Sequence, residues 1–135
     1  MPNPEPLSTG WLMNLAAKIA YLIRTVGGKF DRSQLFRLLE VLEATPGDHE
    51  AMLATAIFAM RQAMRREIPQ RVAEAIRDAL LAIKEAGGTK GDARNFMGYL
   101  RWFFDATERA RLPRNISLSD VNAEWLLKQL GRRVL

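Results

Sequence analysis

Residues 94–111 read RNFMGYLRWFFDATERAR, and this stretch decides the fold. At about 100° per residue, Phe96, Leu100 and Phe103 lie on one face of a helix. Other apolar side chains widen that face on both sides, namely Met97, Tyr99, Trp102, Phe104 and Ala106. A surface helix usually has an apolar face a little over about 100° wide, and this one is roughly twice as wide. Such a helix either lies at the centre of a bundle or presents a second apolar side to another chain.

Trp102 lies at the edge of this wide apolar face, so we expect it to contact a partner protein. Trp125, in the last apolar segment of the chain, is a second candidate for a protein interface. We assign most other apolar residues of the stretch to the core.

Other segments of the chain also place apolar residues at helical spacing, as Leu15, Ile19 and Leu22 do. No segment alternates apolar and polar residues in the way that predicts a strand. The sequence therefore predicts an all-α fold, a compact bundle of five to six short antiparallel helices. The expected helices cover about residues 10–26, 32–44, 49–66, 69–86, 94–111 and 119–130.

The chain has 135 residues, the size of one ordinary domain. Three prolines and few apolar residues occupy the start, so residues 1–10 are expected to form an extended arm. Residues 11–135 are expected to form a single helical-bundle domain.

Short polar residues precede several expected helices and are predicted to cap them. Asp31, followed by Gln34, has the form of a capping box, and Asp48 is expected to cap the third helix. The first and last helices have two candidates each, Ser8 or Thr9 and Ser117 or Ser119. In the third helix, the predicted apolar face consists of Leu53, Ala56, Ile57, Met60 and Met64.

The net charge is +5, and arginines outnumber lysines. This balance favours an anionic partner, either a nucleic acid or an acidic protein face. The absence of cysteine excludes disulfides and thiolate metal sites and is easiest to reconcile with the cytoplasm. The N-terminus lacks the features of a signal peptide, and no apolar run approaches the roughly 20 residues that span a bilayer.

Catalytic chemistry is not expected from these residues. With His49 as its only histidine and no cysteine, the chain cannot form the usual triads. Asp48, His49 and Glu50 are adjacent on a helix and point in different directions, so they do not form a metal site. Residues 87–91 read GGTKG, which differs from a phosphate loop in order and context and is interpreted as an interhelical turn. We expect no enzyme activity, no cofactor, no metal and no small-molecule substrate.

The densest positive charge lies at the junction of the third and fourth expected helices, with Arg61, Arg65, Arg66 and Arg71. Arg61 and Arg65 are one helical turn apart, a spacing suited to contacts along a phosphate backbone. Together with Lys29, these residues are candidates for RNA binding. The alternative is an ordinary solvated face whose arginines pair with nearby acids, Glu67 and Glu74.

Three segments resemble one protein family in their order and approximate spacing. Residues 30–39 read FDRSQLFRLL, residues 62–65 read QAMR, and residues 96–100 read FMGYL. They are similar to segments of the small subunit of type III-A (Csm) CRISPR effector complexes. Phe36 stands where that family has a basic residue, and Met64 stands where it has glycine.

The resemblance implies an all-helical, non-catalytic subunit of an antiviral ribonucleoprotein complex. Neighbouring copies would line up head to tail beside the guide RNA and target RNA, in contact with the large and backbone subunits. Arg37 and Arg65 match basic positions of the family and are implied RNA contacts. Lys29, Arg61, Arg66 and Arg71 come from charge clustering alone.

Two other interpretations remain open. A helix-turn-helix DNA-binding regulator would place a basic helix in the major groove and bind as a dimer. A helical protein–protein adaptor would bind no nucleic acid, and its positive charge would be incidental.

Overall fold

The computed structural model describes residues 3–131, and these residues form helices and turns with no strand. The predicted all-α fold is therefore confirmed. The first two residues of the expected arm and residues 132–135 lie outside the described part. The helices are α1 (Thr9–Thr25), α2 (Arg32–Ala44), α3 (Asp48–Met64), α4 (Gln70–Glu85), α5 (Lys90–Ala106) and α6 (Ala123–Leu130), with a 3₁₀ turn at Leu118–Asp120.

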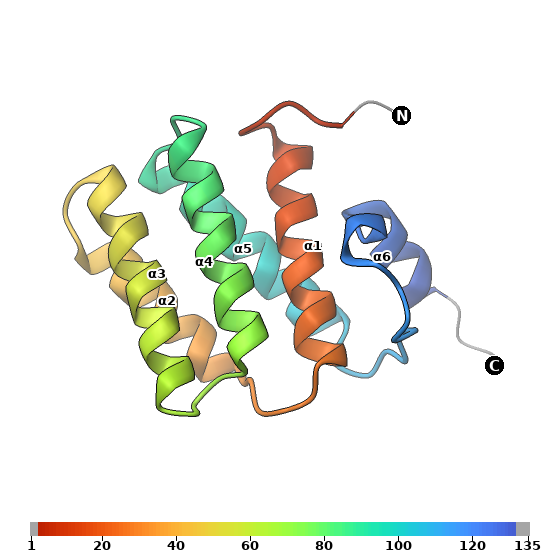
Figure 1. Cartoon of the computed structure of the whole chain (residues 1–135). Helices are drawn as coiled ribbons and strands as arrows, with labels where there is room; N and C mark the ends of the chain where they lie inside the picture. The colour runs from red at the N-terminus through yellow and green to blue at the C-terminus, as the bar shows by residue number, and fades with distance from the viewer. Residues whose placement is uncertain (1–2, 132–135) are drawn as a thin grey trace.

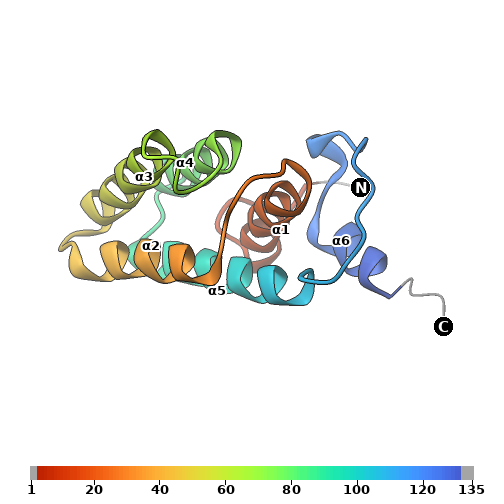
Figure 2. The same cartoon turned by 90° about the horizontal axis from the view of Figure 1, so that it is seen from below.

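The helix α5 lies across the bundle and contacts α1, α2, α3 and α4 (Figure 1). Viewed from below, α2 and α5 form one layer, and α1, α3 and α4 form a second layer against it (Figure 2). The short helix α6 packs on the far side of α1. Of the two possibilities that the wide apolar face left open, a central place in the bundle is observed, while Trp102 on the same helix is exposed.

The helix α5 begins and ends several residues earlier than its apolar pattern predicts. Thr89 and Asp92 form a capping box, in which each side chain accepts from the other residue's backbone N–H. At the other end, the Arg24 guanidinium donates to the carbonyl of Phe104 and to the hydroxyl of Thr107. These bonds satisfy groups that the end of the helix leaves free, so α5 stops at Ala106.

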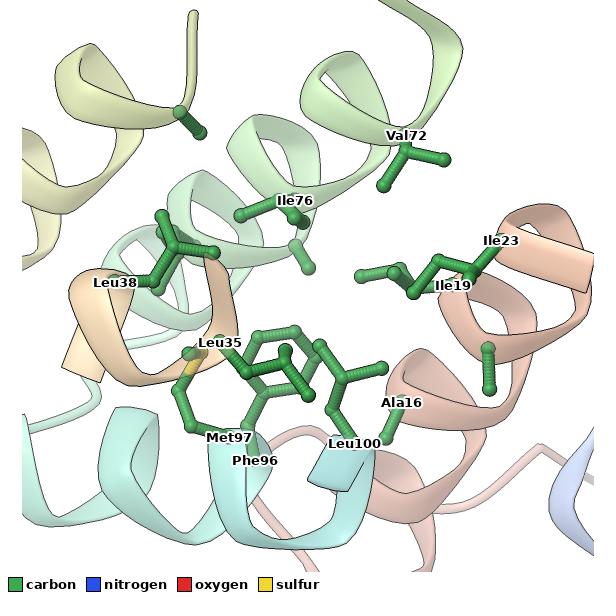
Figure 3. Close-up of a cluster of buried hydrophobic side chains, with 14 of the residues drawn as sticks. Ala16, Ile19, Ile23, Leu35, Leu38, Val72, Ile76, Phe96, Met97 and Leu100 are labelled. Carbon is green, nitrogen blue, oxygen red and sulfur yellow. The ribbon is translucent and has the colours of Figure 1, made fainter. Parts of the chain in front are cut away.

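The core lies between α5 and the helices above it (Figure 3). Phe96 projects from the middle of α5 and is fully buried. Around it stand Ile19 of α1, Leu38 of α2 and Ile76 of α4, each at most 2% exposed. The sequence of α5 therefore positions α1, α2 and α4, because each of them buries apolar side chains against it.

Two predicted caps are confirmed, since Ser8 caps α1 and Asp31 caps α2. The prediction for Asp48 is wrong. Gly47 holds the N-cap position of α3 with a positive φ of 88°, which glycine adopts readily. The Asp48 carboxylate instead accepts from the backbone N–H of Lys90 at 2.9 Å, so it joins the start of α3 to the start of α5.

The start of the last helix also differs from the prediction. Ser117 precedes the 3₁₀ turn, and the side chain of Asn122 caps α6 by accepting from the Trp125 N–H. Val121 between them is fully buried with an extended backbone. The buried, extended Val121 separates the 3₁₀ turn from α6. Local sequence signals do not reveal this interruption of the helix.

The apolar face predicted for α3 is wrong for most of its residues. Ile57 and Met64 are 70% and 79% exposed, Leu53 is exposed as well, and only Ala56 is buried. The buried face consists of smaller side chains, mainly Ala51, Thr55, Ala59 and Ala63. Small residues let helices approach closely, so α3 packs on α2 and α4 through them and leaves its larger apolar residues outside.

Candidate nucleic-acid interface

The six basic side chains singled out in the sequence are all exposed. Four of them surround the α3–α4 junction, which lies at the same end of the molecule as the α1–α2 loop (Figure 1). We call this surface the basic end. It consists of Lys29, Arg37, Arg61, Arg65, Arg66 and Arg71.

The α1–α2 loop touches the α3–α4 junction at one point. A Cβ on Gly28 would lie 3.2 Å from Cγ of Pro69, and Gly28 has a positive φ of 86°. Glycine therefore permits both the turn and the close approach. The contact brings Lys29 beside the segment that opens α4 and carries Arg71.

Arg66 ends α3 in a left-handed conformation, with a φ of 60°. The N–H of Glu67 donates to the carbonyl of Gln62 at 2.8 Å, and the N–H of Arg66 donates to the carbonyl of Ala63 at 3.0 Å. This is the Schellman pattern, in which glycine usually occupies the left-handed position. An arginine there costs about 1 kcal/mol or more of strain, and such strain tends to collect at functional sites.

A buried pair of amides joins α2 to α3 beneath the basic end. Gln62 Nε2 donates to Gln34 Oε1 at 3.1 Å, and Arg61 Nη1 donates to Gln62 Oε1 at 3.2 Å. The predicted capping box at Asp31 is therefore only half formed, because the Gln34 side chain turns to Gln62. Leaving either buried amide without a partner would cost about 1–3 kcal/mol, which explains why the Gln34 side chain bonds to Gln62 and does not complete the capping box.

Arg37 lies one turn after Gln34 on the exposed side of α2. The bond between Gln34 and Gln62 ties that part of α2 to the last turns of α3. The structure therefore places Arg37 on a helix attached to the one that carries Arg61 and Arg65.

The cations of the basic end form none of the ion pairs of the described chain, although Lys29 lies near enough to Asp31 to help lower the pKa of its carboxyl. The ion pairs of residues 3–131 are Arg32–Asp105, Arg77–Asp78, Arg94–Glu43 and Lys128–Glu124. Glu67 is in none of them, and Glu74 instead accepts a hydrogen bond from Gln70. The alternative in which Glu67 and Glu74 pair with these arginines is therefore not observed.

The N-terminus of α4 adds to the positive potential of this end. Pro69 holds the N-cap position, makes no side-chain cap, and no acidic residue lies in the first turn. The free N–H groups of a helix start attract anions, and here Arg71 stands among them. The arrangement suits phosphate groups and offers no set of side chains converging on a base edge.

Trp102 and Trp125, the two candidates for a protein interface, differ in exposure. Trp102 is 69% exposed and borders an apolar hollow of about 220 Å³ between α1, α5 and α6, where Leu127 is also exposed. Trp125 is partly buried, with its ring edge-on to Tyr21 at 5.7 Å between centroids. Trp102 is therefore the better placed of the two for an outside contact.

Other sites considered in the sequence have structural roles or form no cluster. Lys90 Nζ donates to the carbonyl of Thr45, so this lysine ties the start of α5 to the α2–α3 loop. Within residues 3–131, no three histidine or acidic side chains gather in a way that could hold a metal ion. No helix of the described chain has the length and apolar character needed to cross a membrane.

Sequence reasoning missed the Gln34–Gln62 pair and the exposed apolar stripe of α3. The small residues Ala51, Thr55, Ala59 and Ala63 recur every four positions. This pattern could have shown that they form the buried face and that the larger apolar residues of α3 lie outside. That period indicates a second face suited to close helix contact. The amide pair leaves no such local signal, because its members are far apart in the chain.

Comparisons with protein-family models, curated proteins and solved structures found no match for this chain. A function therefore has to be inferred from the residues of the chain and their arrangement. The basic end is the feature on which that inference depends.

Proposed function

We propose that this protein is a non-catalytic, RNA-binding small subunit of a type III CRISPR effector complex, working in the cytoplasm. It would bind the backbone of the guide RNA or target RNA without reading its sequence. The observation that carries the proposal is the basic end, where exposed cations from three helices and a loop gather and take part in none of the ion pairs of residues 3–131.

The chemistry of the basic end favours phosphate over bases. Arginine donates to phosphate oxygens in a fixed, forked geometry, and its charge does not depend on pH in the working range. Contacts of this kind bind every sequence alike. Such binding suits a subunit in a complex where guide–target base pairing already selects the sequence.

The amide pair joins two of the segments that carry the family resemblance. Gln34 belongs to the first segment that resembles the CRISPR subunit, and Gln62 opens the second. Their side chains bond to one another, and Gln62 also accepts from Arg61. Two resembling segments thus meet directly beneath the proposed RNA surface.

Exposed apolar surface supports a place within a larger assembly. Trp102 and Leu127 border the hollow at α1, α5 and α6, and Ile57 and Met64 are exposed on α3. Single exposed apolar residues are common, but grouped ones mark contact surfaces. In the proposed complex they would contact neighbouring copies and the large and backbone subunits.

The test is fluorescence anisotropy of two unrelated single-stranded RNAs, titrated with protein at several salt concentrations. We expect equal affinity for both RNAs and a steep loss of affinity with salt. Arg61→Glu/Arg65→Glu should weaken binding by at least about tenfold and reduce the salt slope by about 1.4, or about 0.7 for each lost phosphate contact. Arg61→Gln/Arg65→Gln should weaken RNA binding less, since this double variant removes the two positive charges without reversing them.

A matched control changes two cations away from the basic end. Arg114→Glu/Lys128→Glu alters the net charge by the same amount, at exposed residues in the connection after α5 and in α6. Equal losses in both double variants would mean that net charge alone attracts RNA, against the proposed site. A wild-type protein that binds no RNA at low salt would contradict the proposal, and sequence-dependent binding to duplex DNA would favour a regulator.

A further inference from the structure

A second surface, separate from the basic end, lies between α2 and α5 (Figure 2). It is a groove of about 150 Å³. Leu35, Leu39 and Met97 form its apolar floor, and Leu35 and Met97 also belong to the core (Figure 3). Phe36 lines one side and is 44% exposed. Neither Trp102 nor any residue of the basic end lines this groove.

Gly98 lines the groove. It lies in the interior of α5, where glycine destabilises a helix relative to alanine. A Cβ added to Gly98 would meet no atom within 4 Å, so no internal contact requires glycine at this position. What the missing side chain provides is room for an outside group to approach the backbone of α5.

Three arginines surround the apolar floor. Arg32 and Arg94 pair with Asp105 and Glu43 at 2.6 and 2.9 Å, and all four side chains are well exposed to solvent. Exposed pairs of this kind stabilise a fold little, so an incoming anion can compete for the guanidinium groups. The third, Arg101, has no ion-pair partner in the described chain, and its guanidinium carbon lies 5.1 Å from the centroid of the Phe36 ring.

We propose that this groove binds an acidic, amphipathic segment of a partner protein. One large apolar side chain of the segment enters beside Gly98, and its flanking carboxylates meet Arg101 and the other arginines. The volume is well below the roughly 300 Å³ at which pockets for small-molecule ligands begin, so it holds about one side chain. This inference does not depend on RNA binding at the basic end.

The polar groups of the groove favour a carboxylate over a nucleobase. Its charged lining consists of guanidinium groups, which only donate hydrogen bonds. A carboxylate only accepts, whereas a base also carries donors that would stay unmatched. A phosphate would satisfy the arginines but leave the apolar floor without a partner. An acidic segment with an apolar residue matches both parts of the surface.

The test is a selection of random peptides displayed on phage against the purified full chain, followed by affinity measurement of the recovered peptides. Gly98→Leu fills the groove and is the negative control, and thermal unfolding establishes that this variant is folded. We expect recovered peptides with a large apolar residue flanked by Asp or Glu. Their affinity should fall at least about tenfold in Gly98→Leu and in Arg101→Glu, as for the loss of a central interface contact. RNA binding should be unchanged in both variants.

Three outcomes would overturn the inference. One is a selection that yields no peptide dependent on Gly98. Another is a set of Gly98-dependent peptides that are neutral or basic. The last is a loss of RNA affinity in Gly98→Leu, which would assign the groove to nucleic acid. Gly98→Ala separates the effect of filling the groove from the effect of helix propensity. It should melt at a higher temperature than wild type, because alanine favours a helix over glycine, and it should lose less peptide affinity than Gly98→Leu.

Discussion

Positive charges serve different purposes in two regions of this molecule. Where α1 meets the end of α5 and the segment before α6, cations are bonded to the protein's own backbone. Lys18 Nζ donates to the carbonyls of Leu118 and Val121, and Arg24 donates to the carbonyl of Phe104. At the basic end, the cations stand exposed without an ion-pair partner in the described chain. Net charge alone therefore says little about binding, because only the second group is available to an outside anion.

The structural cations are also the ones that burial affects. Desolvation lowers the pKa of Lys18, against the opposing charge of Asp120, and desolvation likewise lowers the pKa of Arg24. The guanidinium of Arg24 also lies 4.4 Å from the centroid of the Phe104 ring. Disrupting these contacts of α1 should thus change stability, and disrupting the basic end should change binding.

The largest expected effect tests the stability side of this comparison. Leu126 of α6 is fully buried, so Leu126→Ala should lower the free energy of unfolding by about 2–5 kcal/mol, through lost burial and a cavity. RNA affinity of the folded variant should stay within about twofold of wild type, since α6 is remote from the proposed site. Urea unfolding and anisotropy measure the two quantities. A large loss of RNA affinity in the folded variant would contradict the separation between the region that stabilises the fold and the region that binds RNA.

A smaller loss of stability is expected from Lys18→Met. It leaves two partly buried carbonyls without their donor, which should cost about 1–3 kcal/mol, with unchanged RNA affinity. The pH dependence is a second check. Because the pKa of Lys18 is lowered on folding, the unfolded chain binds this proton more tightly. Stability should rise with pH from the lowered pKa towards 10.5 in wild type, and this rise should be absent in the variant.

Arg66→Gly should separate stability from binding by moving them in opposite directions. Glycine relieves the left-handed strain at the end of α3, so unfolding should become harder by about 0.5–1 kcal/mol. RNA affinity should nevertheless fall a few-fold, and the salt slope should shrink by about 0.7. Arg66→Asn is the control, because asparagine tolerates this conformation but carries no charge. RNA affinity that stays at the wild-type value in both variants would remove Arg66 from the site.

The smallest effect is expected at Asp31, beside Lys29. A hydrogen bond from Ser33 lowers the pKa of the Asp31 carboxyl below its ordinary 3.8, helped by the N–H of Gln34. The resulting stability is present above the ordinary pKa and lost as pH falls through the lowered one. Between about pH 5 and pH 3, wild type should therefore lose slightly more stability than Asp31→Asn, in which asparagine still caps α2. If thermal unfolding shows that wild type and Asp31→Asn lose equal stability over this pH range, the stabilising role of the Asp31 carboxylate is contradicted.

The helices and most of their ends were predictable because their signals are local. Asp31 caps α2 as predicted, and the ends of other helices also have local signals, since α1 stops before Gly27 and Gly28 and Pro69 precedes α4. The central place of α5 also follows from its wide apolar face. Errors arose where a side chain served a distant partner, as Asp48 does for Lys90 and Gln34 does for Gln62.

Some features of the candidate site could likewise be predicted from local sequence signals, and others could not. The arginines at the α3–α4 junction are close in sequence, so their clustering could be predicted. That Lys29 joins them depends on the contact between Gly28 and Pro69, and the lack of ion pairs depends on where Glu67 and Glu74 point. The arginine-rimmed groove could not be predicted, because its walls come from α2 and α5, which are far apart in the chain.

By itself, the sequence determined an all-helical chain with a basic junction between its third and fourth helices. Helical spacing, caps and charge runs depend on residues a few positions apart, and these act before any tertiary contact forms. Only the tertiary structure decided which side of α3 is buried and which cations remain free. Both depend on neighbours from distant parts of the chain, such as Ala59 packed inward while Ile57 faces outward, and Lys18 bonded to Val121 while Arg65 remains exposed.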